Sequence, residues 1–448
     1  MQKNMKMSNH TEKKGLNISA KSFVTAIAVI FVLMALTYGW TFVVPGGGIP
    51  FWKWILSPVL VLGAEDNVSL IAVLVFLLVI GGVFNCLDKC GLMKYMLDKI
   101  TYRFGKERYK LLALVALFFM AMGSFIGSFE ECVPLVPIVV ALAVRLGWDA
   151  LVGMGMSLLA IGCGFAAGVC NPFTVGVAQE LAGLPMFSGM WFRALGFVLV
   201  YGLLVGFLFT YAKRIEKPLD MDATANRFVA DLKMDKGLIC FVILMISGIV
   251  VVLSSVFVTA LQDYTMIIVA VTFLAAGIVS SLVSGMGKKI GGVFWHGLVS
   301  VLPAVLMILM ANSIKYTLVE GNILNTILQA AVATASTLPR WAVILFIYLI
   351  VLIMNFFIAS GSAKAFLLMP LIVPVAQVFG ISAQLCVVAY AFGDGFSNVF
   401  YPTNPVLLIS LGLADVNYGK WVRWSLPFQL MNLLLTGGIL MFGLENGY

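Results

Sequence analysis

Charged residues are scarce in this chain of 448 residues: Asp, Glu, Lys and Arg make up 11% of it, whereas hydrophobic residues make up 62%. Soluble domains are typically about a quarter charged and half apolar, so this composition excludes a soluble enzyme. Histidine is nearly absent, because only His10 and His296 occur, and the seven cysteines include no CxxC pair. We therefore expect free thiols, no disulfide framework, and no zinc or haem site.

Apolar runs of about 20 residues recur along the whole chain, and this is the length that a helix needs to cross a bilayer. They predict an all-α polytopic membrane protein of about ten crossings. The first run, residues 22–45, is too long for the core of a signal peptide. We expect it to be a transmembrane helix behind a cytoplasmic tail of residues 1–21. Further apolar helices are predicted at about 67–86, 189–212, 237–259, 264–285, 290–311 and 424–444.

The net charge is +8, and the basic residues lie between the apolar runs. At such positions their distribution indicates how the chain is oriented in the membrane. A basic amphipathic segment, residues 88–110, is expected to lie on the cytoplasmic surface, and a polar stretch of about 213–236 divides the chain in two. Placing both segments on the cytoplasmic side of the membrane puts 23 of the 28 basic residues on that side. This asymmetry predicts a cytoplasmic N-terminus in an inner or plasma membrane. Arg193 falls on the other face, and Lys364 fits neither side.

The chain contains an internal repeat with an offset of 233 residues. Helix-breaking residues and an asparagine coincide at this offset: Pro137 with Pro370, Gly147 with Gly380, Gly162 with Gly395, Asn171 with Asn404, and Pro172 with Pro405. Glycine and proline have backbone roles, so their coincidence is more informative than matched leucines. Close to the same offset, at 230, Arg193 matches Arg423. Because the charge distribution puts these two arginines on opposite faces, we expect the two halves to be inverted.

The predicted organisation is a first repeat, residues 22–212, and a second repeat, residues 260–448. A cytoplasmic linker of residues 213–236 and a connecting helix of residues 237–259 join them. Inverted repeats with interrupted helices are typical of secondary transporters, whose binding site lies near the bilayer midplane between the repeats. An ancient duplication kept only for packing is the alternative, but the matched residues are helix breakers and not apolar core residues.

Each repeat holds a polar segment between two short apolar arms. Residues 123–134 lie within a hairpin of about 111–146, and residues 359–364 lie within a hairpin of about 341–379. The arms are 15–18 residues long, short of the ~20 that a straight crossing needs, which favours re-entrant hairpins. Two full crossings would also return the chain to the same side, and the polar segments would then be surface loops.

Each repeat also holds an interrupted helix, at about 149–187 and at about 382–416. Glycines, prolines and amides fall in the middle of these apolar segments, in residues 162–174 and again in residues 394–405. Unwound backbone at membrane depth is tolerated only inside protein or beside a cavity. Its carbonyls can hold a cation, and its half-helix ends can hold a carboxylate. The candidate coupling ions are H⁺ and a Na⁺ ion near Asn171 and Asn404.

Four ionisable residues are predicted deep in the membrane: Glu130, Glu131, Lys364 and Asp394. Each costs a few kcal/mol there unless it is paired or solvated. Glu131 and Lys364 are equivalent in the two repeats. They either form a salt bridge that joins the hairpin tips or leave a carboxylate for a substrate ammonium or a coupling ion. A dianionic substrate would meet three carboxylates and one lysine, which favours amino acids, basic ones first.

The order of hairpin, interrupted helix and helix, repeated with inversion, resembles the ion transporter superfamily of elevator carriers. The motifs GSFEE, NPFTVGVAQ, ASGSAK and DGFSN look like its YfcC-like branch, which is grouped with anaerobic four-carbon dicarboxylate carriers and assigned to basic amino-acid antiport. The resemblance implies a mobile transport unit of hairpins and interrupted helices, and a homodimer. The hairpin tips of the dicarboxylate relatives carry a neutral Ser-Asn-Thr motif, whereas this chain has Glu130, Glu131 and Lys364.

The predicted function is secondary active transport of an amino acid, such as arginine or ornithine, by exchange or ion coupling. The alternative is a proton- or sodium-coupled four-carbon dicarboxylate carrier. No catalytic residue, cofactor or nucleic-acid partner is expected. A hydrolytic Ser-Lys dyad is disfavoured, because it would be a lone site without a repeat partner. A channel is also disfavoured, because it would need a continuous polar lining, whereas the polar groups of this chain cluster near the presumed midplane. The candidate substrate- or ion-binding residues are Ser128, Glu130, Glu131, Asn171, Thr174, Ser360, Ser362, Lys364, Asp394, Asn398, Thr403 and Asn404.

Overall fold

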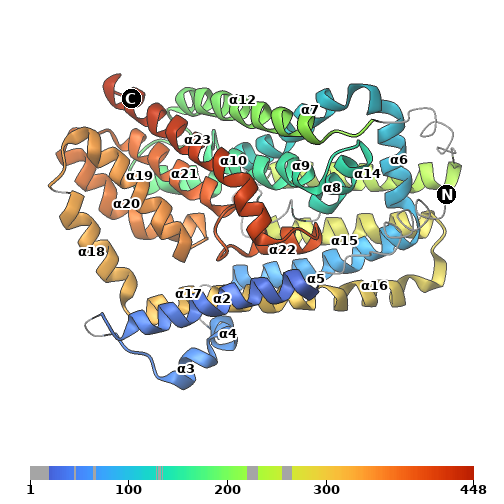
Figure 1. Ribbon diagram of the computed structural model, residues 1–448, viewed down its shortest axis with the longest axis horizontal. Coiled ribbons are helices and arrows are strands. Elements are labelled where there is room, and N and C mark those ends of the chain that lie inside the picture. The colour runs from blue at the N-terminus through green and yellow to red at the C-terminus, as the bar shows by residue number, and fades with distance from the viewer. Residues whose placement is uncertain are drawn as a thin grey trace. The chain divides into compact units, whose positions relative to one another are not determined.

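The chain is helical wherever its structure is described. The computed structural model describes residues 20–44, 47–63, 67–127, 129, 133, 135–218, 231–254, 265–335 and 337–448. Every secondary-structure element in these ranges is a helix (Figure 1), which confirms the predicted all-α class. A helix satisfies its backbone hydrogen bonds within its own segment, as a chain in lipid requires.

The helices follow the apolar runs of the sequence. In the first half they are α2 (Ala20–Thr41), α3 (Phe51–Ile55), α4 (Ser57–Leu60), α5 (Asn67–Lys89), α6 (Leu92–Phe104), α7 (Arg108–Ala121), α8 (Val136–Arg145), α9 (Ala150–Met154), α10 (Ala160–Ala166), α11 (Val177–Leu181) and α12 (Met190–Ile215). In the second half they are α14 (Leu232–Ser254), α15 (Thr265–Val283), α16 (Ile290–Ser300), α17 (Leu302–Glu320), α18 (Ile323–Ala335), α19 (Arg340–Phe357), α20 (Gly361–Val378), α21 (Ala383–Asn398), α22 (Pro405–Leu413) and α23 (Tyr418–Glu445). Three π-helical segments, η3 (Met122–Ile126), η5 (Gly155–Leu159) and η6 (Pro172–Gly176), interrupt the first half.

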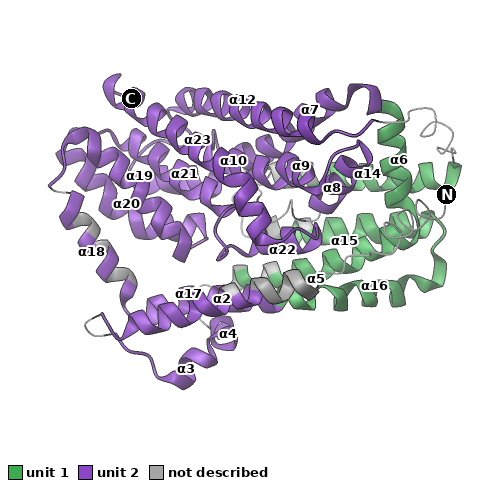
Figure 2. Cartoon of the chain, in the orientation of Figure 1, with its two compact units in different colours: residues 1–23, 68–103, 220–305 green, residues 24–67, 104–219, 306–448 purple. Residues whose placement is uncertain are grey.

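The chain forms two compact units, which Figure 2 shows in different colours. Unit 1 comprises residues 1–23, 68–103 and 220–305, and unit 2 comprises residues 24–67, 104–219 and 306–448. In unit 1, α14 packs along α15, and α15 contacts α16. Unit 2 contains both hairpin regions and both interrupted helices, so every described residue of the candidate site belongs to this one unit.

Six helical runs in the described residues are long and apolar enough to cross a membrane. They are Leu92–Ile126, Met190–Ile215, Gly287–Glu320, Arg340–Phe357, Gly361–Val378 and Tyr418–Glu445. The chain is therefore a multi-pass membrane protein, and the total of about ten crossings stays a prediction. The basic segment predicted to lie on the membrane surface contains α6, which forms one continuous run with α7.

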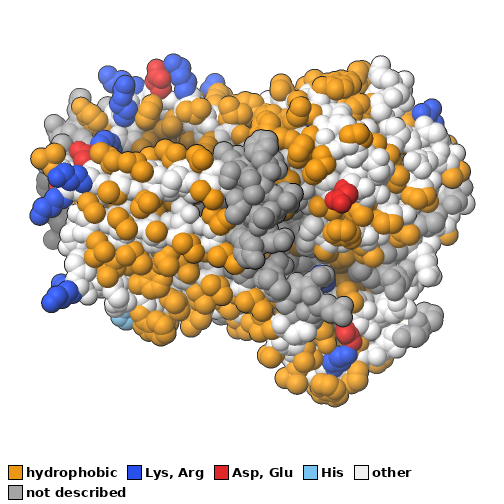
Figure 3. Space-filling model, turned by 180° about the vertical axis from the view of Figure 1, so that it is seen from behind, with side chains coloured by type: hydrophobic (Ala, Val, Ile, Leu, Met, Phe, Trp, Pro, Cys, Tyr) orange, Lys and Arg blue, Asp and Glu red, His pale blue; other side chains and the backbone are white. Residues whose placement is uncertain are grey.

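Large apolar side chains cover the outside of the helices. On α14, Ile239, Ile243 and Val250 are 56%, 59% and 58% exposed, and on α23 Leu434 is 76% exposed. On the face drawn in Figure 3, hydrophobic side chains are spread widely and charged ones are few. Exposed apolar surface of this extent is unfavourable in water, and in a bilayer it contacts lipid tails.

Unit 2 repeats one packing pattern twice. We call α7, η3 and α8 hairpin 1, and α19 and α20 hairpin 2. The first arms pack on the interrupted helix of their own repeat, α7 on α10 and α19 on α21. The second arms contact the other repeat: α8 contacts α22, and α20 contacts α11. The offset of 233 residues relates each of these contacts to an equivalent contact in the other half. The two halves therefore repeat the packing as well as the sequence.

Two equivalent glycines allow α10 and α21 to cross closely. A Cβ atom added at Gly162 would lie 2.5 Å from Val399 Cγ1, and one added at Gly395 would lie 2.1 Å from the backbone nitrogen of Ala166. Ala166 and Val399 are themselves equivalent at the offset of 233 residues. The two contacts are therefore equivalent in the two repeats. This close approach is the physical reason that both halves have a glycine at this position.

An arginine joins the two ends of each hairpin. Arg108, the first residue of α7, donates from Nη1 to the carbonyl oxygen of Leu146 at 3.0 Å, just beyond α8. Arg340, the first residue of α19, donates from Nη2 to the carbonyl oxygen of Gly380 at 3.1 Å, just beyond α20. Each hairpin therefore starts and ends at the same place, which both a re-entrant hairpin and a pair of full crossings require.

The hairpin arms differ in length. α8 has ten residues and is about 15 Å long, half of the ~30 Å hydrocarbon core. In contrast, α19 and α20 have 18 residues each, and both are long enough to cross. An arm of 18 residues lies within the predicted arm length of 15–18, so the re-entrant form of hairpin 2 stays a prediction. Length favours a re-entrant arm in hairpin 1 alone.

Candidate functional site

The first interrupted helix unwinds after α10. Helical backbone ends at Ala166 and resumes at Pro172 in η6, and we call residues 167–171 break 1. Asn171 caps η6, because its Oδ1 accepts the backbone N–H groups of Phe173 at 2.9 Å and Thr174 at 3.3 Å. Proline suits the first helical position because a missing N–H leaves nothing unpaired there. The Asn-Pro pair thus restarts the helix.

The second interrupted helix unwinds in the same way between α21 and α22. Residues 399–404 form break 2, and Asn404 Oδ1 accepts the backbone N–H of Val406 at 2.9 Å before Pro405 restarts the helix. We expected this break to begin at Asp394, which is wrong. Asp394 lies inside α21, about one turn before its end, because the glycines beside it pack closely and do not unwind the helix.

Ser124 and Arg193 hold the backbone of break 1. Ser124, in η3 of hairpin 1, donates to the carbonyl oxygen of Ala167 at 2.8 Å and accepts the N–H of Val169 at 3.0 Å. Arg193 of α12 is only 2% exposed, and its Nε and Nη2 donate to the carbonyl oxygen of Val169 at 3.1 and 2.9 Å. The sequence indicated Arg193 as an orientation marker only, so its contact with the break was missed.

Neutral side chains contact the backbone of break 2. Trp421 of α23 is fully buried, and its Nε1 donates to the carbonyl oxygen of Val399 at 2.7 Å. Asn404 Nδ2 donates to Asn398 Oδ1 at 2.9 Å, across the break. The helix that follows each interrupted helix, α12 or α23, therefore supplies a buried donor to a backbone carbonyl of the break.

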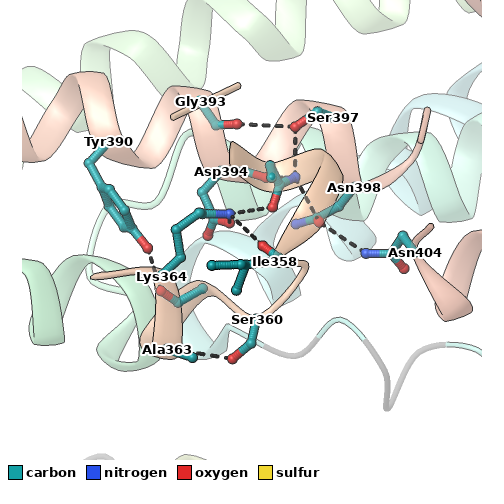
Figure 4. A network of polar contacts seen from close by, with 12 residues as sticks. Ile358, Ser360, Ala363, Lys364, Tyr390, Gly393, Asp394, Ser397, Asn398 and Asn404 are labelled. Atoms are coloured by element: carbon teal, nitrogen blue, oxygen red, sulfur yellow. Dashed lines mark hydrogen bonds and ion pairs between the residues drawn. The ribbon is translucent and has the colours of Figure 1, made fainter. Parts of the chain in front are cut away.

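A buried ion pair lies beside break 2 and joins hairpin 2 to α21 (Figure 4). Lys364 Nζ of α20 lies 2.5 Å from Asp394 Oδ1, and both side chains are 0% exposed. The ammonium also donates to the carbonyl oxygen of Ile358 at 3.3 Å and to Asn355 Oδ1. A charge at this depth is unfavourable unless it is paired, and Asp394 is the counter-charge among the described residues.

Asn355 connects this ion pair to break 2. Its Nδ2 group donates to the carbonyl oxygen of Asp394 at 2.8 Å, to Ser397 Oγ at 2.7 Å and to Asn398 Oδ1 at 3.0 Å. Asn355 is 1% exposed and was not among the predicted site residues. The sequence carried a signal for it, because it is the one amide in the apolar arm 341–358.

Three buried oxygens of this region accept or donate no hydrogen bond within the described structure: Thr174 Oγ1, Thr403 Oγ1 and Asp394 Oδ2. Gly361 lies next to the side chains of Thr174 and Asp394. A Cβ added there would lie 2.4 Å from Thr174 Cγ2 and 2.7 Å from Asp394 Oδ2. Buried polar atoms are normally paired, so these three atoms are candidates for contact with a ligand.

The structure brings several predicted residues together and separates others. Ser128, Glu130 and Glu131 lie outside the described residues, and so does the predicted Glu131–Lys364 pair. Four residues, Lys364, Asp394, Asn398 and Asn404, share the network of Figure 4. Ser360 is exposed and caps α20 through the N–H of Ala363, and Ser362 is half-buried beside it.

Metal-binding side chains are sparse around the site. In the described part of the chain, no group of three or more His, Cys, Asp and Glu residues could hold a metal ion. The six cysteines of that part are thiols, and Cys132 lies outside it. The Oδ1 atoms of Asn171 and Asn404, the candidate Na⁺ neighbours, accept backbone N–H groups, so they suit helix capping better than metal coordination.

The chain is similar in sequence to known proteins over most of its length. The model of the DcuC family, described as the C4-dicarboxylate anaerobic carrier, matches residues 59–444. The chain is 30% identical over 401 residues to the Escherichia coli (strain K12) protein named "Putative basic amino acid antiporter YfcC", with 83% of this chain and 78% of the relative covered. It is 27% identical over 399 residues to an uncharacterized protein of Haemophilus influenzae (strain ATCC 51907 / DSM 11121 / KW20 / Rd), with 84% and 76% covered.

A solved structure of similar extent is the YdaH transporter of Alcanivorax borkumensis, which is 19% identical, with 94% of this chain and 99% of that chain covered and a TM-score of 0.45. The DcuC family match begins before α5 and ends in the last turn of α23, so it includes both hairpins and both breaks. This match and the relatives make the protein a membrane transporter, and the chain belongs to the DcuC family.

Proposed function

We propose that this transporter carries amino acids, basic ones such as arginine and ornithine first, across the cytoplasmic membrane by alternating access. The observation that carries the proposal is the pair of breaks in one compact unit, with a buried threonine hydroxyl that has no partner in the described structure beside break 1, at Thr174 of η6, and another within break 2, at Thr403. Unwound segments near the midplane are where secondary transporters bind substrate and coupling ions.

The charges of the described site support a cationic substrate. The Lys364 ammonium is paired with Asp394, and the Arg193 guanidinium donates to backbone carbonyls. Neither cation is free to bind the second carboxylate of a dianion. The sequence adds Glu130 and Glu131 between η3 and α8, outside the described residues. A net negative charge in this part of the chain favours a substrate that carries an ammonium or guanidinium group.

The repeated packing supports alternating access. Two halves with the same interhelical contacts can exchange conformations, so that each half opens the site to one side in turn. We propose that the hairpins and interrupted helices move as one elevator unit and that the protein works as a homodimer. The basic residues of the linker favour a cytoplasmic N-terminus. Exchange of one amino acid for another, or coupling to an ion, would drive the movement.

A four-carbon dicarboxylate is the second candidate substrate. The description of the family model favours it, and so does the restart of helix at Pro405. The N-terminus of α22 carries a partial positive charge that attracts a carboxylate. In this case the acidic residues Glu130 and Glu131 would serve ion coupling instead of substrate recognition.

Thermal unfolding of the purified protein with candidate substrates tests the proposal. A ligand that binds only the folded state raises the Tm. We expect arginine, lysine or ornithine to raise the Tm, and succinate and fumarate to leave it unchanged. A rise with succinate or fumarate, and none with the amino acids, would overturn the proposed substrate class and favour the second candidate.

Valine substitutions connect this response to the breaks. Thr174→Val and Thr403→Val remove a hydroxyl and keep the shape of the side chain, so we expect the ligand-induced rise in Tm to shrink. Thr317→Val is a matched control, because Thr317 of α17 also has a buried, unpartnered hydroxyl. An equal response in all three variants would show that the hydroxyls of Thr174 and Thr403 do not contact the substrate.

A further inference from the structure

The Lys364 ammonium is enclosed by three oxygen atoms, two from α19 and its C-cap residue and one from α21. Nζ donates to Asp394 Oδ1 in α21 at 2.5 Å, to the carbonyl oxygen of Ile358 at 3.3 Å, and to Asn355 Oδ1 in α19. An ammonium has three N–H donors, and all three are used here. The surrounding side chains, Asn355 and Asp394, are 1% and 0% exposed, so water does not compete for the position.

These oxygens are of the kind that hard metal cations prefer. Carboxylate, amide and backbone carbonyl oxygens form the usual ligand sets of such ions. A further oxygen is close by: Asp394 Oδ2 is buried and has no hydrogen-bond partner in the described structure. It borders Gly361, where an added Cβ would lie 2.7 Å away. Removing the ammonium would thus leave a negatively charged group of oxygens around a vacant cation position.

Helix electrostatics do not explain why a lysine stands here. Lys364 lies at the start of α20, four residues after the N-cap Ser360. A positive charge near the N-terminus of a helix opposes the helix dipole, and a buried charge is costly in itself. The oxygen atoms of Asn355, Ile358 and Asp394 must therefore supply the stabilisation, which they do by surrounding the ammonium as they would surround a metal ion.

We propose that the Lys364 ammonium is a tethered cation that fills a cation-binding position. The wild-type protein then binds no Na⁺ between α19, α20 and α21, and removal of the ammonium unmasks a Na⁺ site made by Asn355, Asp394 and the carbonyl of Ile358. This assignment rests on the contacts of Lys364. Its consequence, a transport cycle that needs no Na⁺ at this position, rests on the proposed transport function.

Two substitutions of Lys364 test the assignment. Lys364→Ala removes the ammonium and leaves space, whereas Lys364→Met removes the charge but fills the position with a methyl group. Both leave Asp394 buried without a counter-charge, so both should lower the Tm in choline chloride. At equal ionic strength, we expect Na⁺ to raise the Tm of Lys364→Ala by more than about 3 °C over choline. The wild type and Lys364→Met should change by less than about 1 °C.

Several outcomes would overturn the proposal. One is an equal Tm of Lys364→Ala in NaCl and choline chloride, and another is a Na⁺-specific rise in the wild type. If Lys364→Ala can be purified in NaCl and not in choline chloride, that difference supports the site, whereas failure in both salts contradicts it. The double variant Lys364→Ala/Asp394→Asn should lose the Na⁺ response, and a retained response would place the ion elsewhere. These readouts do not involve transport, so their failure is distinct from a failure of the proposed function.

Discussion

Break 1 and break 2 have similar backbones and different surroundings. Each is a short unwound segment that ends in an asparagine cap, with proline at the first helical position. Break 1 is held by the hydroxyl of Ser124 and by Arg193, whose guanidinium contacts backbone carbonyls. Break 2 lies beside the buried Lys364–Asp394 ion pair. The interruption of the helix is thus common to both repeats, and the polar groups that stabilise it are not.

The comparison also shows that each hairpin is tied to the interrupted helix of its own repeat. Ser124 of hairpin 1 bonds the backbone of break 1, and Asn355 and Lys364 of hairpin 2 bond the side chains and backbone of α21. Breaking a buried ion pair costs more than breaking neutral hydrogen bonds. We infer that the connection between a hairpin and its interrupted helix is stronger in the second repeat.

Removing the charge of Asp394 should have the largest effect. Asp394→Asn leaves the Lys364 ammonium buried without a counter-charge, which is expected to lower the free energy of unfolding by about 3–5 kcal/mol. The double variant Lys364→Met/Asp394→Asn has no unpaired charge, so much of the stability should return. Thermal unfolding in detergent measures both. A single variant as stable as the wild type would contradict the importance of the pair.

The hydrogen bonds that Arg193 of α12 donates should stabilise the fold more than the one that Trp421 of α23 donates, because Arg193 is charged and Trp421 is neutral. Arg193→Met removes charge-assisted hydrogen bonds from break 1, at a cost of about 1.5–3 kcal/mol. Trp421→Phe removes one neutral hydrogen bond from break 2, at a cost of about 0.5–1.5 kcal/mol, together with a small loss of packing. Chemical unfolding of the two variants side by side checks the order, and a larger loss for Trp421→Phe would reverse the comparison.

The crossing glycines allow the most closely matched comparison. Gly395→Ala places a Cβ against the backbone nitrogen of Ala166, which cannot move aside, and overpacking of this kind costs about 1–3 kcal/mol. Gly162→Ala meets the side chain of Val399, which can shift, so its cost should be lower. The difference in Tm between the two variants is the measurement. If Gly162→Ala were the more damaging, the described crossing of α10 and α21 would be wrong.

The sequence predicted the architecture well where backbone roles are visible in residue type. Glycine, proline and a capping asparagine mark an interrupted helix directly, so the repeat, the breaks and the transporter class followed from Asn171, Pro172 and their equivalents. Helix boundaries were less predictable. We expected unwinding at Asp394, but a glycine can also mark close helix packing, and its conformational freedom alone does not distinguish the two.

Contacts between side chains were harder to predict than elements. The Glu131–Lys364 pair, expected because the two residues are equivalent in the repeats, stays a prediction because Glu131 lies outside the described residues, whereas the contact of Lys364 with Asp394 was not foreseen. Equivalence indicates which residues occupy the same place in each half, whereas contact depends on how the halves pack. The described partner of Lys364 lies in its own repeat, at Asp394. Asn355 was overlooked because a single amide in an apolar run does not disturb the hydrophobic pattern of the run.

Counterflow in proteoliposomes tests the central claim most directly. Vesicles loaded with unlabelled arginine, and diluted into labelled arginine without Na⁺, should accumulate label only when they contain the wild-type protein. Loading with unlabelled ornithine should support the same accumulation, and protein-free vesicles should show none. Accumulation of labelled succinate in succinate-loaded vesicles, with no arginine counterflow under any internal amino acid, would contradict the account of an amino-acid carrier.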